Sequence, residues 1–156
     1  RCGLAAVALD GGLYAIGGRS DDGAYLSSLE RFDAKKSSWI VVSSPMLTGR
    51  CAHAAAATSN EIFVVGGHNG TSPFSSAEMY DSEKRIWTEI APMEASRINP
   101  AAVVVRTGAV YVFGGSSLST AERYDPVADE WTALPDMTAP RCRHAAVAVS
   151  GTVYIL

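Results

Sequence analysis

Two Cys-x-His pairs are the residues of this 156-residue chain best suited to binding a metal ion. Cys51 precedes His53, and Cys142 precedes His144, by two positions. Thiolate and imidazole are typical zinc ligands, but each pair supplies only half of a tetrahedral site. The two pairs occupy equivalent places in a repeated pattern, so we expect them to lie too far apart to share one ion. The sequence therefore predicts neither a metal site nor a bound cofactor.

The cysteines could instead act as reactive thiols. Cys2, Cys51 and Cys142 each follow an arginine directly, and a nearby positive charge favours the thiolate form. Oxidation or electrophilic modification of Cys51 and Cys142 is therefore one hypothesis. Since the three residues are equivalent in separate repeats, we expect no disulfide among them. Unpaired cysteines are typical of reducing compartments, which predicts a cytoplasmic location.

Repeated carboxylates could indicate acid–base chemistry, but their repetition favours a scaffold role. A glutamate, a spacer, an aromatic residue and an aspartate recur at residues 30–33, 78–81 and 122–125. A catalytic carboxylate is needed once, whereas scaffold parts are needed in every repeat. We interpret the aspartates as turn residues that bond the following backbone. We also hypothesise that Glu78 forms a partly buried ion pair with a repeat arginine, Arg50 or Arg97.

A repeat organises the whole chain. Each unit contains, in order, a double glycine, an aromatic-Asp pair, a tryptophan six positions after that aspartate, a methionine, and an arginine four positions later. These landmarks are Gly17-Gly18, Phe32-Asp33, Trp39, Met46 and Arg50, then Gly66-Gly67, Tyr80-Asp81, Trp87, Met93 and Arg97, then Gly114-Gly115, Tyr124-Asp125, Trp131, Met137 and Arg141. The predicted units span residues 1–49, 50–96 and 97–140, followed by an incomplete unit at 141–156. No helix or Lys-Ser/Thr follows the double glycines, so they do not form a phosphate-binding loop.

Each unit contains four short apolar segments separated by Gly, Asn, Asp and Pro, which predicts four β-strands and an all-β fold. The first strands are expected at residues 3–9, 52–58, 101–106 and 145–149, with Asp10-Gly11-Gly12 as a hairpin turn. The second strands are expected at 13–18, 62–67 and 110–115. The second strands are apolar throughout, as expected when neighbouring sheets cover both faces.

The landmarks closely resemble the kelch repeat, whose unit builds one four-stranded antiparallel blade of a β-propeller. The resemblance covers essentially the whole chain. Pro45-Met46 and Pro92-Met93 are most similar to kelch domains attached to BTB domains in ubiquitin-ligase adaptors, while the third unit departs with Pro135-Asp136-Met137. The resemblance implies a partial kelch propeller of about three and a half blades. The small residues of the first strands then lie nearest the propeller axis.

If the ring of blades is incomplete, the outer faces of its first and last sheets are expected to be exposed. Propellers close with about four to eight blades, so we expect this chain to be an excerpt of a longer protein. The missing blades either lie elsewhere in that protein or come from a second copy, which would self-associate to complete the ring.

The composition favours a globular chain, with 47% hydrophobic and 19% charged residues. The net charge is −3 and the basic residues are scattered, which argues against partners such as nucleic acid or an anionic membrane. No apolar run reaches membrane-spanning length, and no signal-peptide pattern opens the chain. Without such a signal, we interpret Asn69-Gly70-Thr71 as a turn and not as a glycosylation sequon.

The binding residues are predicted to lie in loops that differ in length between the units. From the second glycine to the repeat glutamate there are 12 positions in the first unit, 11 in the second and 7 in the third. Variable loops on a repeated scaffold commonly carry recognition, and the kelch resemblance implies a face built from this loop and from the turn after the repeat arginine. The predicted partner-binding residues are Arg19, Ser20, Asp21, Tyr25, Cys51, His68, Asn69, Asn99, Ser116, Cys142 and Arg143.

Arg19 and Arg143 are the predicted anchors for an acidic peptide, because guanidinium matches carboxylate in a bidentate way. The alternative for Arg19 is an ordinary solvated loop charge. Phe74 aligns with Leu26 and Leu118, which favours a packing role over that of an aromatic anchor.

The resemblance implies a protein-binding module with no enzymatic activity. It would be the substrate-recognition domain of an adaptor that presents a protein segment to a cullin-type ubiquitin ligase, with BTB and BACK domains upstream. Binding to a cytoskeletal, actin-type scaffold is an alternative. An enzyme is another, because kelch propellers also resemble a copper oxidase and sialic acid epimerases. A copper site would need an unrepeated cluster such as two Tyr and two His, and two of the three histidines here occupy repeat positions.

Overall fold

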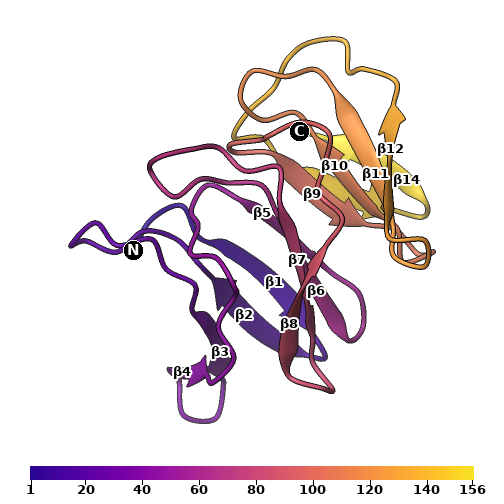
Figure 1. Ribbon diagram of the computed structural model, residues 1–156. Helices are drawn as coiled ribbons and strands as arrows, with labels where there is room; N and C mark the ends of the chain where they lie inside the picture. The colour runs from indigo at the N-terminus through magenta and orange to yellow at the C-terminus, as the bar shows by residue number, and fades with distance from the viewer.

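Strands make up the regular secondary structure in this computed structural model, which describes residues 1–156 (Figure 1). It has no helix with the length and hydrophobicity needed to cross a bilayer. In chain order the strands are β1 (Ala5–Leu9), β2 (Gly12–Ile16), β3 (Leu29–Asp33), β4 (Ser38–Val42), β5 (Ala54–Ala57), β6 (Glu61–Val65), β7 (Ala77–Asp81), β8 (Ile86–Ile90), β9 (Ala101–Val104), β10 (Val110–Phe113), β11 (Ala121–Asp125), β12 (Glu130–Leu134), β13 (Ala146–Val149) and β14 (Thr152–Ile155).

Consecutive strands pair with one another to form antiparallel sheets. Strands β1 to β4, β5 to β8 and β9 to β12 form three four-stranded sheets, and β13 pairs with β14 in a two-stranded sheet. Across the second sheet, Ala56 pairs with Phe63, Phe63 with Met79, and Met79 with Thr88. The predicted partial propeller of four-stranded antiparallel blades is therefore confirmed.

The strands are shorter than the apolar segments suggest because positive-φ residues interrupt them. Gly17 and Gly18 have φ of +57° and +98° and lie outside β2. The predicted turn at residues 10–12 is also wrong by one residue. Gly12 belongs to β2, and the two-residue turn consists of Asp10 and Gly11 with φ of +47° and +67°, as in a type I′ hairpin.

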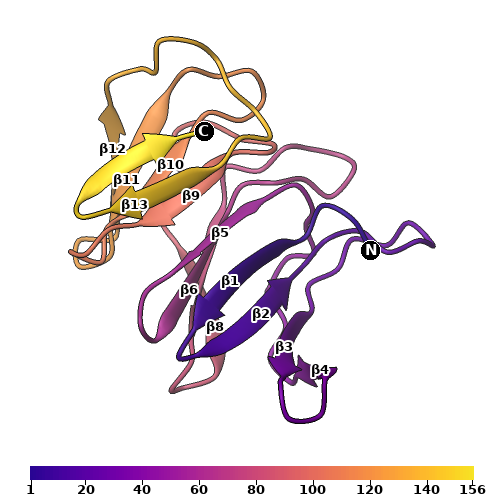
Figure 2. The ribbon, with the colours of Figure 1, turned by 180° about the vertical axis from the view of Figure 1, so that it is seen from behind.

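The first strand of each sheet lies against the first strand of the next. β5 contacts both β1 and β9, and β13 contacts β9. Figure 2 shows β1, β5, β9 and β13 side by side, as expected of the innermost strands of a propeller. Their small residues allow this close approach.

Successive side chains of β6 point to opposite faces of its sheet, so they pack in two separate core clusters, one against each neighbouring sheet. Ile62 and Val64 pack with the first sheet in a cluster that includes Ile16 and Leu29. Phe63 and Val65 pack with the third sheet, and their cluster includes Val112. All four of these β6 side chains are buried, which confirms that a middle blade is covered on both faces.

The repeated tryptophans join adjacent sheets. Trp87 packs on its cross-strand neighbour Tyr80 with a ring-centroid distance of 5.2 Å, and its Nε1–H donates to the Ser44 carbonyl of the preceding sheet at 3.0 Å. Trp131 makes the equivalent bond to Ala91 at 2.6 Å. Trp39 stacks on Phe32 in the same way but is 46% exposed, because no sheet precedes its own.

A buried arginine–glutamate pair links the first sheet to the second, and another links the second to the third. Arg50 Nη2 lies 2.6 Å from Glu78 Oε1, and both side chains are almost fully buried. The Glu78 carboxylate also accepts hydrogen bonds from the backbone N–H groups of Leu47 and Thr48, in the segment that crosses from the first sheet. This confirms the hypothesised ion pair, with Arg50 as the partner, and Arg97 forms the equivalent pair with Glu122.

Both ends of the stack expose apolar residues. On the first sheet, Leu4, Leu13 and Trp39 line a groove of about 400 Å³. At the other end, Val149 and Tyr154 of the two-stranded sheet are more than half exposed. Completion of the ring by further blades or by a second copy stays a prediction.

Candidate functional site

Two kinds of loop that are far apart in the sequence lie together at one end of the strands. The residue after each repeat arginine pairs with the loop after the double glycine, through antiparallel bridges between Cys2 and Arg19 and between Cys51 and His68. In the third blade, Ser116 N–H donates to the Ile98 carbonyl, and Ile98 N–H donates to Ser116 Oγ, both at 2.8 Å. These segments form the loop face of the molecule.

A chain of backbone hydrogen bonds runs across this face from blade to blade. Ala52 N–H donates to the Gly3 carbonyl, Asn99 N–H to the Ala52 carbonyl, and Arg143 N–H to the Asn99 carbonyl, at 2.8, 2.7 and 3.1 Å. All four residues have φ between +54° and +61°. Glycine and asparagine tolerate this region at little cost, whereas alanine and arginine are strained there. This series of backbone bonds was not predicted from the sequence, although Gly3 and Asn99 at equivalent positions were a signal for it.

Four of the predicted binding residues form one unrepeated cluster between the first two blades. The Arg19 guanidinium carbon lies 5.6 Å from the centroid of the Tyr25 ring. Tyr25 meets the His68 ring edge to face at a centroid distance of 5.5 Å, and His68 Nε2 lies 3.3 Å from Cys51 Sγ. We call Arg19, Tyr25, His68 and Cys51 the inter-blade cluster.

The remaining predicted residues are not members of this cluster. Ser20 and Asp21 follow Arg19 in the same loop, and Asn69 follows His68. Asn99, Ser116 and Arg143 form a second group through the backbone bonds of the third and fourth blades, with Cys142 exposed beside Arg143. Phe74 is half-buried with Arg50 over its ring at 5.1 Å, which is consistent with a packing role.

The structure corrects the expected reactivity of Cys51. Burial raises the pKa of the Cys51 thiol, nearby Cys2 adds to the rise, and Arg19 opposes it. The guanidinium of Arg50, which was expected to favour the thiolate, is instead bound to Glu78. All three cysteines are free thiols. Enhanced reactivity of Cys142 stays a prediction.

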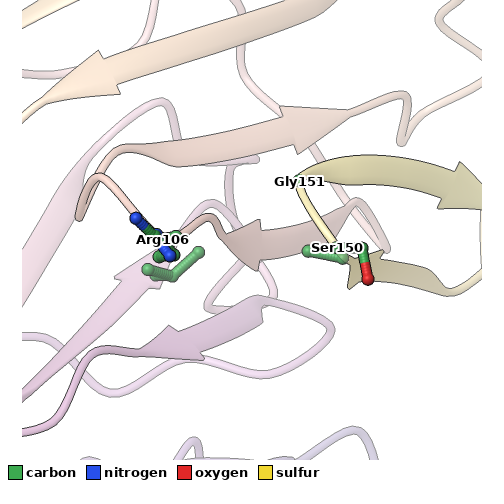
Figure 3. A pocket seen from close by; sticks show the side chains of 5 residues that line it. Arg106, Ser150 and Gly151 are labelled. Carbon is green, nitrogen blue, oxygen red and sulfur yellow. The ribbon is translucent and has the colours of Figure 1, made fainter.

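The Cys-x-His pairs do not converge on a common centre. Cys51 faces His68, while His53 is buried against Gly17, and no group of three or more His, Cys, Asp or Glu side chains is placed to hold an ion. At the opposite ends of the strands, a shallow cavity of about 600 Å³ lies between the turns of the third and fourth blades. Figure 3 shows its lining residues Arg106, Ser150 and Gly151, none of which was a predicted binding residue.

His53 makes folding sensitive to pH. Both of its ring nitrogens are buried without hydrogen-bond partners, and burial, with a smaller effect of the Arg50 charge, lowers the pKa of His53 to about 3. The unfolded chain, with an ordinary histidine pKa of 6.5, then binds the proton more readily than the folded chain. We expect the free energy of unfolding to fall as the pH drops from about 6.5 toward 3, by at most about 5 kcal/mol.

Urea titrations of the wild type and of His53→Leu between pH 7 and 5 would measure this effect above the range in which most carboxylates titrate. The variant should have the shallower pH dependence in that window. Equal slopes for the two proteins would contradict the role of His53.

Comparison with known proteins supports the same architecture. A family model described as the KLHDC2/KLHL20/DRC7 Kelch-repeats domain matches residues 1–156. An F-box/kelch-repeat protein of Arabidopsis thaliana is 41% identical over 100 residues, which cover 62% of this chain and 21% of that protein. Kelch-like protein 38 of Rattus norvegicus is 33% identical over 117 residues, which cover 72% of this chain and 20% of that protein.

Kelch-like protein 35 of Mus musculus is 33% identical over 116 residues, which cover 74% of this chain and 19% of that protein. The matched region thus spans about a fifth of the length of these relatives. The repeated landmarks, the four-stranded antiparallel blades and the match over residues 1–156 agree. The chain belongs to the kelch-repeat family.

Proposed function

We propose that this chain is the substrate-recognition domain of a cullin-type E3 ubiquitin ligase adaptor. It binds a protein or peptide segment on the loop face and has no enzymatic activity. The main support for this binding site is the inter-blade cluster. It is unrepeated, partly exposed and held between two sheets. Recognition residues of repeat scaffolds are expected to differ between repeats in this way.

The chemistry of the cluster fits an acidic partner. Arg19 is exposed, and its Nε–H donates to the Gly23 carbonyl at 3.2 Å while its guanidinium lies near the Tyr25 ring. These contacts hold the guanidinium ready to bind a carboxylate, and Tyr25 supplies an adjacent aromatic surface. Arg143, also exposed, offers a second charge at the far end of the chain of backbone bonds.

The adaptor role rests on the similarity to kelch domains attached to BTB domains. Several relatives are named Kelch-like proteins, and the matched region covers about a fifth of their length. We place the contacts to the cullin in domains outside this chain, and the working location in the cytoplasm. Actin-type scaffold binding is the second candidate, which co-sedimentation with actin filaments would separate from the adaptor role.

Arg19→Ala is expected to weaken peptide binding by about 10- to 100-fold, as for the loss of an interface anchor of about 1.4–3 kcal/mol. Binders selected on the wild-type chain from a random peptide display library would provide the probes, and fluorescence anisotropy would provide the Kd. Arg106→Ala is the matched control, because Arg106 is also exposed but lies at the opposite ends of the strands. Peptides that bind both variants like the wild type would contradict the proposed face.

A further inference from the structure

The loop between β6 and β7 places a base beside an Asn-Gly bond. Asn69 is exposed, and the backbone N–H of Gly70 donates a hydrogen bond to His68 Nδ1 at 3.1 Å. We propose that Asn69 is a site of spontaneous deamidation in which His68 acts as the general base. The product would carry an aspartate or isoaspartate at position 69.

His68 is held in the tautomer and orientation that this reaction needs. Since Nδ1 accepts the hydrogen bond from Gly70, the ring proton lies on Nε2, which faces Cys51 Sγ at 3.3 Å. Tyr25 packs against the same ring at a centroid distance of 5.5 Å. The lone pair of Nδ1 is therefore directed at the one backbone proton that must leave for Gly70 to become a nucleophile.

The amide of Asn69 is also polarised for attack. Its Oδ1 accepts hydrogen bonds from the backbone N–H groups of Thr71 at 3.1 Å and Ser72 at 3.3 Å. Two donors on one carbonyl oxygen stabilise the negative charge that develops there in a tetrahedral intermediate. Gly70 has no side chain to hinder approach, and at φ +90° it adopts a conformation suited to glycine.

The reaction needs no oxidant and no cofactor. The Gly70 nitrogen attacks Asn69 Cγ while its proton passes to His68 Nδ1. This attack closes a five-membered ring. The Cγ–Nδ2 bond then breaks, and ammonia leaves with the proton returned by His68, so that the ring becomes a succinimide. Water opens this ring at either carbonyl, so the net change is water consumed and ammonia released.

The other two asparagines lack this arrangement and serve as controls in the same chain. The nitrogen of Glu61, which follows Asn60, donates to Thr58 Oγ1 at 3.0 Å, and a hydroxyl is a poor base. Asn99 precedes Pro100, which has no N–H to give up.

Deamidation would change the charge of the loop face. A Cβ at position 70 would lie 2.6 Å from the Tyr25 hydroxyl, so this loop directly touches the inter-blade cluster. A carboxylate at position 69 would add a negative charge near Arg19 and oppose an acidic partner. This consequence rests on the proposed function, whereas the reaction itself does not.

Peptide mapping of the intact chain after incubation at neutral pH and physiological temperature would test the proposal. Asn69 is expected to convert at least about tenfold faster than Asn60 or Asn99. His68→Gln should slow the conversion of Asn69 at least about tenfold, because the amide can accept the Gly70 hydrogen bond but cannot take up its proton. Conversion of Asn69 no faster than that of Asn60, or an equally fast His68→Gln chain, would overturn it.

A second measurement keeps the test valid if the variant folds poorly. Unfolding the wild-type chain in urea retains the Asn69-Gly70 bond but removes the His68 contact. Conversion of Asn69 should then slow several-fold relative to the folded chain. Conversion at an equal or higher rate in urea would show that His68 gives no assistance.

Discussion

Glu78→Gln is expected to lower the free energy of unfolding by about 3–5 kcal/mol, because it leaves the buried charge of Arg50 without its counter-ion. Both side chains are almost fully buried, with N–O separation of 2.6 Å. The carboxylate also accepts two backbone N–H groups from the segment that crosses from the first sheet, and an amide has only one oxygen to offer. Denaturant unfolding would measure the loss, and thermal unfolding should show a fall in Tm of roughly 10 °C.

The chain contains a matched control for this substitution. Glu30 occupies the equivalent repeat position and pairs with Arg1, but their side chains are 26% and 17% exposed. Solvent weakens such a pair, so Glu30→Gln should cost less than about 1 kcal/mol. Equal losses at Glu30 and Glu78 would show that burial of the pair is not what matters.

A double replacement separates the charge from the packing. Arg50→Met combined with Glu78→Leu removes both buried charges and should cost less than the sum of the two single replacements. A strictly additive loss would show that the two groups do not interact in the folded chain.

Gly66→Ala is expected to destabilise the fold by about 2–5 kcal/mol through two separate penalties. Gly66 has φ of +67°, which costs an L-residue about 1–2 kcal/mol. An added Cβ would also lie 2.5 Å from the carbonyl oxygen of Arg97. The backbone cannot move away easily, because the Gly66 carbonyl accepts from Arg50 Nη1 at 2.9 Å and its N–H donates to Ser76.

Gly11→Ala isolates the first of these penalties. Gly11 has the same φ of +67°, but no heavy atom lies within 4 Å of a Cβ placed there. This replacement should therefore cost only the conformational penalty of about 1–2 kcal/mol. Thermal unfolding of the two variants measures the difference, and equal Tm values would contradict the steric role of Gly66.

Repetition made much of the architecture predictable. A landmark that recurs in each unit, such as the tryptophan six residues after the aromatic-Asp pair, must serve a role that each blade needs. The pairing of Glu78 with a repeat arginine was predicted on this basis, and Arg50 is its partner. Strand ends were less predictable, because an apolar residue such as Val105 looks the same in a strand as just beyond its last paired residue.

The arrangement of the loop face depended on contacts between blades. Arg19 and Tyr25 were predicted to bind a partner, but no spacing rule could place them beside His68 and Cys51, which belong to the next blade. The raised pKa of Cys51 has the same origin, since burial between blades outweighs the opposing charge of Arg19, while the guanidinium of its sequence neighbour Arg50 is bound to Glu78.

The amino-acid pattern alone was enough to specify an all-β repeat, the order of its strands and the residue types that pack between blades. These properties are local and recur, so each unit repeats the same information. The inter-blade cluster, the chain of backbone bonds and the base beside Asn69 required the folded chain. They join residues of different units, and the distances between those residues are set by how the blades pack around a common axis.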